Sequence, residues 1–307
     1  MTGDWVERKL ALPPDARFDR IILPGYCRGD VETIERRTAI HVIRGPRDVR
    51  DLPEMFDPRA REKPTLNEHR IEIIAEINDA AHLPPATIFE LADRYRADGA
   101  DVIDLGCDPQ SERPAWDGVG ELVRELKARG HRVSVDSFHI DEVRRACEAG
   151  AELVLSVNGT NRDAAADFGA EVVAIPDTPD DYTLPHPTAV PLVKRAVRYR
   201  IDPIIEPIGF GFAASLGRYL DVRRRHPQAA MMMGIGNLSE MTEVDAAGVN
   251  MLLIGFCAEQ RIDSVLTTQV INWARSSVAE CDLARRIIHP AVTHRIVTQR
   301  LAERPVM

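Results

Sequence analysis

The stretch "VSVDSFHIDEVRRACEAGA" (133–151) combines a strand and a helix, with an acid at the junction between them. Its first valines indicate a short buried strand, which ends at Asp136 and Ser137. The apolar residues of the second half share one face of an amphipathic helix. Gly150 follows that helix, where a glycine can take the left-handed conformation that ends helices. The stretch is therefore a strand–helix unit that carries a carboxylate to the end of its strand.

The same unit recurs along the chain from residue 70 onward. We predict strands, separated by helical patterns, at 70–77, 101–106, 131–137, 152–158, 171–177, 202–209, 229–236 and 263–270. Nearly continuous apolar strands that alternate with helices indicate an α/β fold with a parallel sheet covered on both faces. An open doubly wound sheet and a closed barrel both fit this pattern. The count of eight strands and a span near the typical ~250 residues favour a (β/α)8 TIM barrel.

Residues 1–62 do not belong to this series. The segment 18–30, "FDRIILPGYCRGD", predicts a strand and a turn, and 39–45, "AIHVIRG", predicts a second strand. A polar linker follows them. Two strands and one helix are too few to bury a core alone. We therefore predict a partial small α/β segment and linker at 1–62, which begins inside a longer domain, and a barrel domain at 63–307.

Composition excludes several classes of protein. The net charge of −9 and the pI of about 5.5 argue against a nucleic-acid partner, since such binding depends on basic patches. No apolar run approaches the roughly 20 residues that span a bilayer. The first residues, "MTGDWVERKLALPP", lack the apolar core of a signal peptide, so we expect a cytoplasmic protein that does not bind membranes. The five cysteines are odd in number and widely spaced, which argues against a disulfide framework and a zinc site.

Polar side chains stand at one end of nearly every predicted strand. In a barrel these ends meet at the face that carries the active site. The candidate site residues at the strand ends are Asn78, Asp79, Asp104, Asp136, Ser137, Asn158, Asp177, Glu206, Asn237 and Gln269. An acid at such a junction can also be an ordinary helix N-cap. For Asp136 we favour the site, because residues 139–141 offer a later start for the helix.

A ring of acids and amides suits a ligand that is rich in N–H groups. A carboxylate accepts two parallel hydrogen bonds from an N–H/NH2 edge, as it does from Arg. A guanidine-like heterocycle such as a pterin presents this edge. An anionic substrate would be repelled unless Mg²⁺ or Arg113 intervenes.

Several segments at these positions resemble dihydropteroate synthase, a pterin-binding barrel enzyme. They are "GADVIDLGCDPQSERPAW" (99–116), "VSVDSFHIDEVRRACEAGAELVLSVNG" (133–159) and "PIIEPIGFGF" (203–212). The segments "IAEINDA" (74–80), "MMMGIGNLSEMTEVDAAGVN" (231–250) and "SVLTTQVINWARSSVAECDLARR" (264–286) are similar to the synthase-related proteins of tetrahydromethanopterin-using microbes. The resemblance covers about residues 70 to 290.

The resemblance implies a reaction and roles for individual residues. A 6-hydroxymethyl-dihydropterin diphosphate would condense with an arylamine, with loss of diphosphate. Asp136 and Glu206 would hold the pterin as the catalytic pair, and Asp104 would shape the site. Ser111 and Arg113 match the loop of the arylamine site, and Asn78 would help to hold the diphosphate and its Mg²⁺. No tightly bound organic cofactor is expected, and related barrels suggest a homodimer.

The chain also departs from the family pattern. The strand-seven lysine falls within "GIGNLSE" (234–240), which has no lysine, and the strand-eight Arg-x-His aligns with "TTQ" (267–269). These cations would stabilise the leaving diphosphate. Asn237 instead resembles the strand-seven Asn of methyltetrahydrofolate corrinoid methyltransferases. A pterin-dependent methyltransferase and a non-catalytic pterin-binding subunit are therefore alternatives to the synthase.

Overall fold

The computed structural model describes residues 2–15, 17–57, 65–107, 114–178, 188–298 and 301. The chain divides into two compact units, Met1–Pro64 and Thr65–Met307. The first unit contains α1 (Gly3–Lys9), β1 (Arg20–Leu23), α2 (Glu32–Thr38), β2 (His41–Arg44) and the 3-10 helix η1 (Val49–Met55). Strands β1 and β2 are parallel, and a small cluster of buried side chains that includes Val6, Leu23 and Ile34 packs inside the unit.

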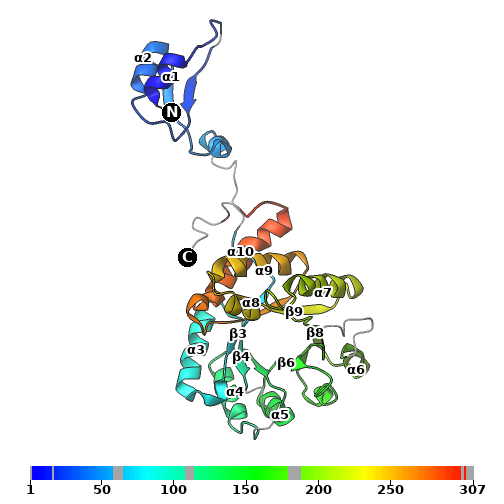
Figure 1. The fold of residues 1–307 in the computed structure, drawn as a ribbon. Helices are drawn as coiled ribbons and strands as arrows, with labels where there is room; N and C mark the ends of the chain where they lie inside the picture. The colour runs from blue at the N-terminus through cyan, green and yellow to red at the C-terminus, as the bar shows by residue number, and fades with distance from the viewer. Residues whose placement is uncertain are drawn as a thin grey trace. The chain divides into compact units, whose positions relative to one another are not determined.

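The second unit is a closed barrel of eight parallel strands, which confirms the predicted fold (Figure 1). The strands are β3 (Glu72–Ile77), β4 (Val102–Gly106), β5 (Val133–Asp136), β6 (Leu153–Val157), β7 (Glu171–Ala174), β8 (Tyr199–Ile201), β9 (Ala230–Gly234) and β10 (Ser264–Thr268). They follow one another in chain order, and β10 pairs with β3 to close the ring.

Helices lie outside the strands. They are α3 (Pro85–Ala97), α4 (Val119–Ala128), α5 (Ile140–Glu148), α6 (Ala189–Lys194), α7 (Phe212–Arg225), α8 (Gly236–Met241), α9 (Ala246–Glu259) and α10 (Ser277–His294), with 3-10 turns η2 (Ala80–His82), η3 (Ala165–Asp167) and η4 (Asn272–Ala274). Among the described residues, no helix combines the length and the apolar character that a membrane span requires.

Two apolar layers hold the barrel together. The larger cluster lies between strands and helices and includes Ile73, Leu126 and Ile254. The smaller cluster fills the barrel interior with Ile74, Leu155, Met232 and neighbours. Because interior side chains fill the barrel, the space for a ligand lies above them, at the carboxyl ends of the strands.

One strand lies earlier in the chain than the sequence predicts and is shorter. We predicted a strand at 202–209, but β8 ends at Ile201 and no strand covers 202–209. Pro203 and Pro207 explain the difference, since proline has no N–H to give to a neighbouring strand. The early end of β8 puts Asp202, rather than Glu206, at the mouth of the barrel.

Candidate functional site

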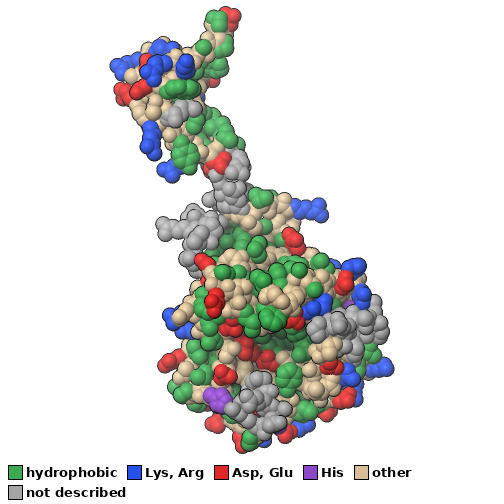
Figure 2. Space-filling model, viewed as in Figure 1, with side chains coloured by type: hydrophobic (Ala, Val, Ile, Leu, Met, Phe, Trp, Pro, Cys, Tyr) green, Lys and Arg blue, Asp and Glu red, His purple; other side chains and the backbone are tan. Residues whose placement is uncertain are grey.

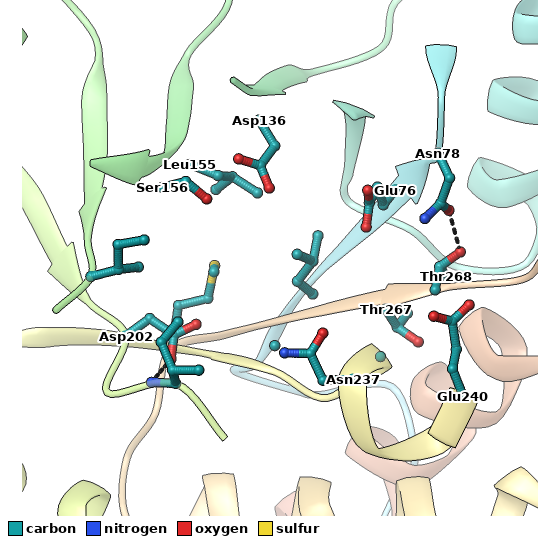
Figure 3. Close-up of a pocket in the computed structure, with 16 residues that line it drawn as sticks. Glu76, Asn78, Asp136, Leu155, Ser156, Asp202, Asn237, Glu240, Thr267 and Thr268 are labelled. Carbon is teal, nitrogen blue, oxygen red and sulfur yellow. Dashed lines mark hydrogen bonds between the residues drawn. The ribbon is translucent and has the colours of Figure 1, made fainter. Parts of the chain in front are cut away.

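A cavity of about 320 Å³ opens at the carboxyl ends of the strands (Figure 3). Its floor includes interior side chains such as Leu155, Met232 and Leu266. The remaining lining residues are Glu76, Asn78, Asp136, Ser156, Ile175, Asp202, Ile204, Gly234, Gly236, Asn237, Glu240, Thr267 and Thr268. We call this cavity the mouth pocket.

Four carboxylates line the mouth pocket, and each comes from a different element. Glu76 is on β3, Asp136 ends β5, Asp202 follows β8 and Glu240 is on α8. Figure 2 shows acidic side chains in the hollow encircled by the strands of Figure 1. Within the described part of the chain, neither Lys nor Arg lines this pocket. The described lining is therefore strongly acidic and is suited to a ligand that donates hydrogen bonds.

Burial at the barrel mouth raises the pKa values of these acids. Burial raises the pKa of Glu76 to about 7, and the charges of Asp136 and Glu240 raise it in the same direction. Burial likewise raises the pKa of Asp136 and of Glu240. A carboxyl group with a pKa near 7 exchanges its proton at physiological pH, which is a common property of functional sites.

Asp104 lies on β4, next to these acids, but outside the pocket lining. It is fully buried, and one of its oxygens accepts a hydrogen bond of 2.6 Å from the Ser134 hydroxyl. The other oxygen has no partner among the described residues. Burial, together with the charges of Asp136 and Glu76, raises the pKa of Asp104 well above its usual range. Its surroundings therefore favour the neutral form of the Asp104 carboxyl group.

Asp202 is held rigidly at the pocket wall. Its Oδ1 accepts hydrogen bonds from the Tyr219 hydroxyl at 2.5 Å and from the Ile204 N–H at 2.8 Å. Burial raises the pKa of Asp202 to about 6, and the Tyr219 hydrogen bond opposes that rise. Ile204 has a φ of 61°, which is unusual for a β-branched residue. Arg218 stabilises this turn, since it donates to the carbonyl oxygens of Pro203 and Ile204.

Amides and hydroxyls complete the lining. Asn78 Oδ1 accepts a hydrogen bond of 2.6 Å from Thr268 Oγ1, which joins the ends of β3 and β10 (Figure 3). Asn237, at the start of α8, presents its amide to the pocket. Ser156 has a φ of 60° at a bulge of β6, and backbone strain of this kind clusters at ligand sites.

The structure brings together three of the predicted site residues: Asn78, Asp136 and Asn237 all line the mouth pocket. Asp104 lies beside them as described above. Helix α5 begins at Ile140, with His139 as its N-cap, so Asp136 does not cap the helix. Ser111 and Arg113 lie outside the described residues.

Other predicted residues lie outside the pocket lining. Glu206 was predicted to hold the pterin, but it pairs with Arg218 at 3.5 Å and does not line the pocket. Ser137 donates a hydrogen bond of 2.5 Å to Glu142 and accepts one from the His139 N–H. Gln269 is buried and donates to Asp98.

The remaining three predicted residues lie in the loops that follow strands. Asp79 is exposed and begins η2 with a φ of 50°. Asn158 accepts hydrogen bonds from the N–H and the hydroxyl of Thr160, which fixes the turn after β6. Asp177 accepts from the Gly159 N–H at 2.7 Å. Each residue follows a strand, as predicted, but none of the three lines the pocket, and the side chains of Asn158 and Asp177 stabilise their own loops.

The described residues do not form a dedicated magnesium site. No group of three or more His, Cys, Asp or Glu within them is arranged to hold a metal ion. The Asn78 oxygen already accepts the Thr268 hydroxyl. Mg²⁺ prefers octahedral oxygen ligands and usually arrives with substrate phosphates. We therefore assign no step of the chemistry to a metal.

Sequence reasoning missed Glu76, Asp202, Ser156 and Glu240. Glu76 lies two residues before Asn78, and alternate residues of a strand point to the same side. This spacing could have identified Glu76 once Asn78 was chosen. Asp202 was missed because the predicted strand, 202–209, placed it at the amino end of the strand rather than at the carboxyl end. Nothing in the local pattern distinguishes Glu240 from an ordinary helix residue.

Comparisons with known proteins match the barrel and the N-terminal segment separately. Residues 76–200 match the family described as pterin binding enzyme, and the matched segment includes Glu76, Asp104 and Asp136. The predicted resemblance to pterin-binding barrels is thereby confirmed, and the tetrahydromethanopterin type stays a prediction. Residues 1–47 match a separate family of unknown function, DUF6513.

One curated relative spans both units. It is the uncharacterized protein MJ0107 of Methanocaldococcus jannaschii, which is 22% identical over 92% of this chain. The chain covers 65% of the length of that relative.

Solved structures of dihydropteroate synthase share the barrel fold. The Yersinia pestis enzyme, in complex with a pterine-sulfa conjugate, is 18% identical, with a TM-score of 0.55 over 73% of this chain and 94% of its own. The Xanthomonas albilineans enzyme, in complex with 7,8-dihydropteroate, is 19% identical, with a TM-score of 0.54 over 75% of this chain and 95% of its own. At this level of identity the likeness establishes the fold.

Proposed function

We propose that the barrel is a transferase domain whose substrate is a reduced pterin bound in the mouth pocket. The observation that carries the proposal is the acidic lining: Asp136, Asp202 and Glu240 provide carboxylate oxygens, and the described lining contains no cation. A pterin carries N–H and NH2 donors along one edge, and carboxylates accept such donors in pairs. A cavity of about 320 Å³ lies within the range of small-molecule sites.

The first candidate reaction is that of dihydropteroate synthase. It would join a pterin diphosphate to an arylamine, which for the tetrahydromethanopterin type is expected to carry a ribose phosphate. Catalysis would require positive charge near the departing diphosphate. The described lining offers none, and Arg113, the cation that the sequence suggests, lies outside the described residues. Support for this reaction therefore comes from the family match and the fold.

Transfer of a one-carbon group between a reduced pterin and a partner is the second candidate. Two observations favour it: Asn237 lines the pocket, and the described wall suits a pterin without phosphates. The amide of Asn237 can donate to one pterin atom and accept from another. This reaction requires no anion site, so the acidic lining is compatible with it.

Two product assays separate the candidates. Diphosphate release from pterin diphosphate plus an arylamine, lost in Asp136→Asn, would support the synthase. Demethylation of a methylated reduced pterin, dependent on a corrinoid acceptor and lost in the same variant, would support methyl transfer. Asp141→Asn is the matched control, because Asp141 is on neighbouring α5, with its side chain 57% exposed. Saturable pterin binding with neither product would indicate a non-catalytic pterin-binding subunit.

We also propose that the protein forms a homodimer through the outer surface around α9. Leu252 on α9 is 77% exposed, and Met241 and Val244 nearby in the chain are exposed as well. Figure 2 shows hydrophobic side chains gathered over α9. Large exposed apolar patches commonly mark protein interfaces. Sedimentation analysis should find a dimer that Leu252→Glu converts to a monomer, and an unaltered mass in that variant would contradict this interface.

A further inference from the structure

Glu76 lies in the mouth pocket where the neighbouring strand leaves room for its carboxyl group. It lies near the carboxyl end of β3, and its side chain lines the pocket together with that of Asp136 on β5 (Figure 3). On the neighbouring strand β4, Gly106 leaves room for its carboxyl group. A Cβ atom added at Gly106 would lie only 2.5 Å from Glu76 Oε1. The absence of a side chain at Gly106 therefore lets the Glu76 carboxyl group lie against the strand.

No described residue donates a hydrogen bond to the Glu76 carboxyl group, and the nearby titratable groups disfavour its charge. Burial and the charges of neighbouring acids all act in the same direction. The described titratable groups that interact with Glu76 come from the β3 loop, β4, β5, α3 and α8: Asp79, Asp104, Asp136, Tyr95 and Glu240. Because the described residues supply neither a donor nor a cation to stabilise a carboxylate, the neutral acid is favoured.

Three of the other acids differ from Glu76 in their hydrogen bonds or their position. Asp202 already accepts two hydrogen bonds, from Tyr219 and Ile204, which favour its charged form. Asp104 is fully buried and does not line the pocket. Asp136 accepts a hydrogen bond from Ser156. Within the described chain, Glu76 and Glu240 both line the pocket and have no hydrogen-bond donor, but only for Glu76 do the charges of neighbouring acids add to the effect of burial.

We propose that Glu76 binds the pterin as a neutral carboxylic acid and donates its O–H to an acceptor atom of the pterin ring. This inference rests on the proposed pterin site. It adds Glu76 as a hydrogen-bond donor in a pocket whose other acids accept hydrogen bonds. A pterin presents ring nitrogens and a carbonyl oxygen as well as N–H groups. Asp136, Asp202 and Glu240 can accept from the N–H groups, whereas only a protonated acid among these residues can donate. Pterin affinity then depends on the protonated fraction of Glu76.

The test is the pH dependence of binding of 6-hydroxymethyl-7,8-dihydropterin to the full chain. With a pKa of about 7 for Glu76, the competent fraction falls from roughly nine-tenths at pH 6 to roughly one-tenth at pH 8, so the wild-type Kd should rise about tenfold. Glu76→Gln keeps an N–H donor but cannot ionise. Its Kd should vary less than about threefold over this range, and at pH 8 it should bind more tightly than wild type. The control Glu121→Gln, at an exposed position of α4, should keep the tenfold change.

Calorimetry provides a second readout that needs no variant. Binding at pH 8, measured in two buffers of different ionisation enthalpy, should reveal uptake of close to one proton per pterin by the wild-type protein. Equal pH dependence in wild type and Glu76→Gln, or no proton uptake at pH 8, would overturn the role of Glu76 while leaving the pterin site intact. Failure of the wild-type protein to bind at pH 6 would instead overturn the proposed function.

Discussion

Replacing Glu76 by Gln should make the stability of the protein less dependent on pH. Burial raises the pKa of Glu76 from 4.5 to about 7 in the folded protein, whereas in the unfolded chain the side chain titrates near 4.5. The contribution of this raised pKa to stability is fully present below pH 4.5. It is lost as pH rises toward 7, because the unfolded state ionises while the folded state holds its proton.

The size of the effect follows from the two pKa values. Linkage gives a loss of about 2 kcal/mol in the free energy of unfolding between pH 5 and pH 7.5 from Glu76 alone. Typical domains are stable by about 5–15 kcal/mol, so the change is measurable. Glutamine has nearly the same shape and does not ionise, so Glu76→Gln should lack this part of the pH dependence.

The assay is urea unfolding at pH 5 and pH 7.5 for wild type, Glu76→Gln and the control Glu121→Gln. Wild type and the control should lose more stability than Glu76→Gln over this range, by about 2 kcal/mol. Coincident changes in all three proteins would refute the account of a buried, protonated Glu76. Such a result would mean that water or a neighbouring donor stabilises its carboxylate.

Two further predictions concern the framework of the barrel. The side chain of Arg285 is 3% exposed and pairs with Asp101 and Asp282. Arg285→Met should therefore lower the free energy of unfolding, measured in urea, by about 3–5 kcal/mol. A loss below about 1 kcal/mol would contradict this structural role of Arg285. Tyr219→Phe removes the 2.5 Å hydrogen bond to buried Asp202, so the pKa of Asp202 should rise further and stability should fall by about 1–3 kcal/mol. Carboxyl titration by NMR would check the direction of the pKa change, and a fall would contradict it.

The barrel could be predicted from sequence because its signal is repeated eight times. Each predicted unit pairs a short apolar run with a helical pattern. A wrong assignment in one unit therefore does not change the predicted barrel. Strand β8 shows the limit of this reasoning. Apolar residues such as Ile204 and Ile205 suggested a strand, but the prolines on either side prevent one.

The site was less predictable than the fold. Position at a strand end identified Asn78, Asp136 and Asn237, since the barrel forces these ends together. It could not tell a pocket residue from one that stabilises its own loop, as Asn158 does. That difference depends on side-chain direction and on local donors, which strand spacing does not determine.

The reduced-pterin titration tests the central claim most directly. Purified wild-type protein at pH 6 should bind 6-hydroxymethyl-7,8-dihydropterin saturably, with one pterin per chain. Asp136→Asn and Asp202→Asn should each weaken binding by about tenfold or more, because each removes a carboxylate acceptor for pterin N–H groups, while Asp141→Asn should bind like wild type. Absence of binding at millimolar pterin, in protein shown to be folded, would contradict the assignment of the mouth pocket as a pterin site.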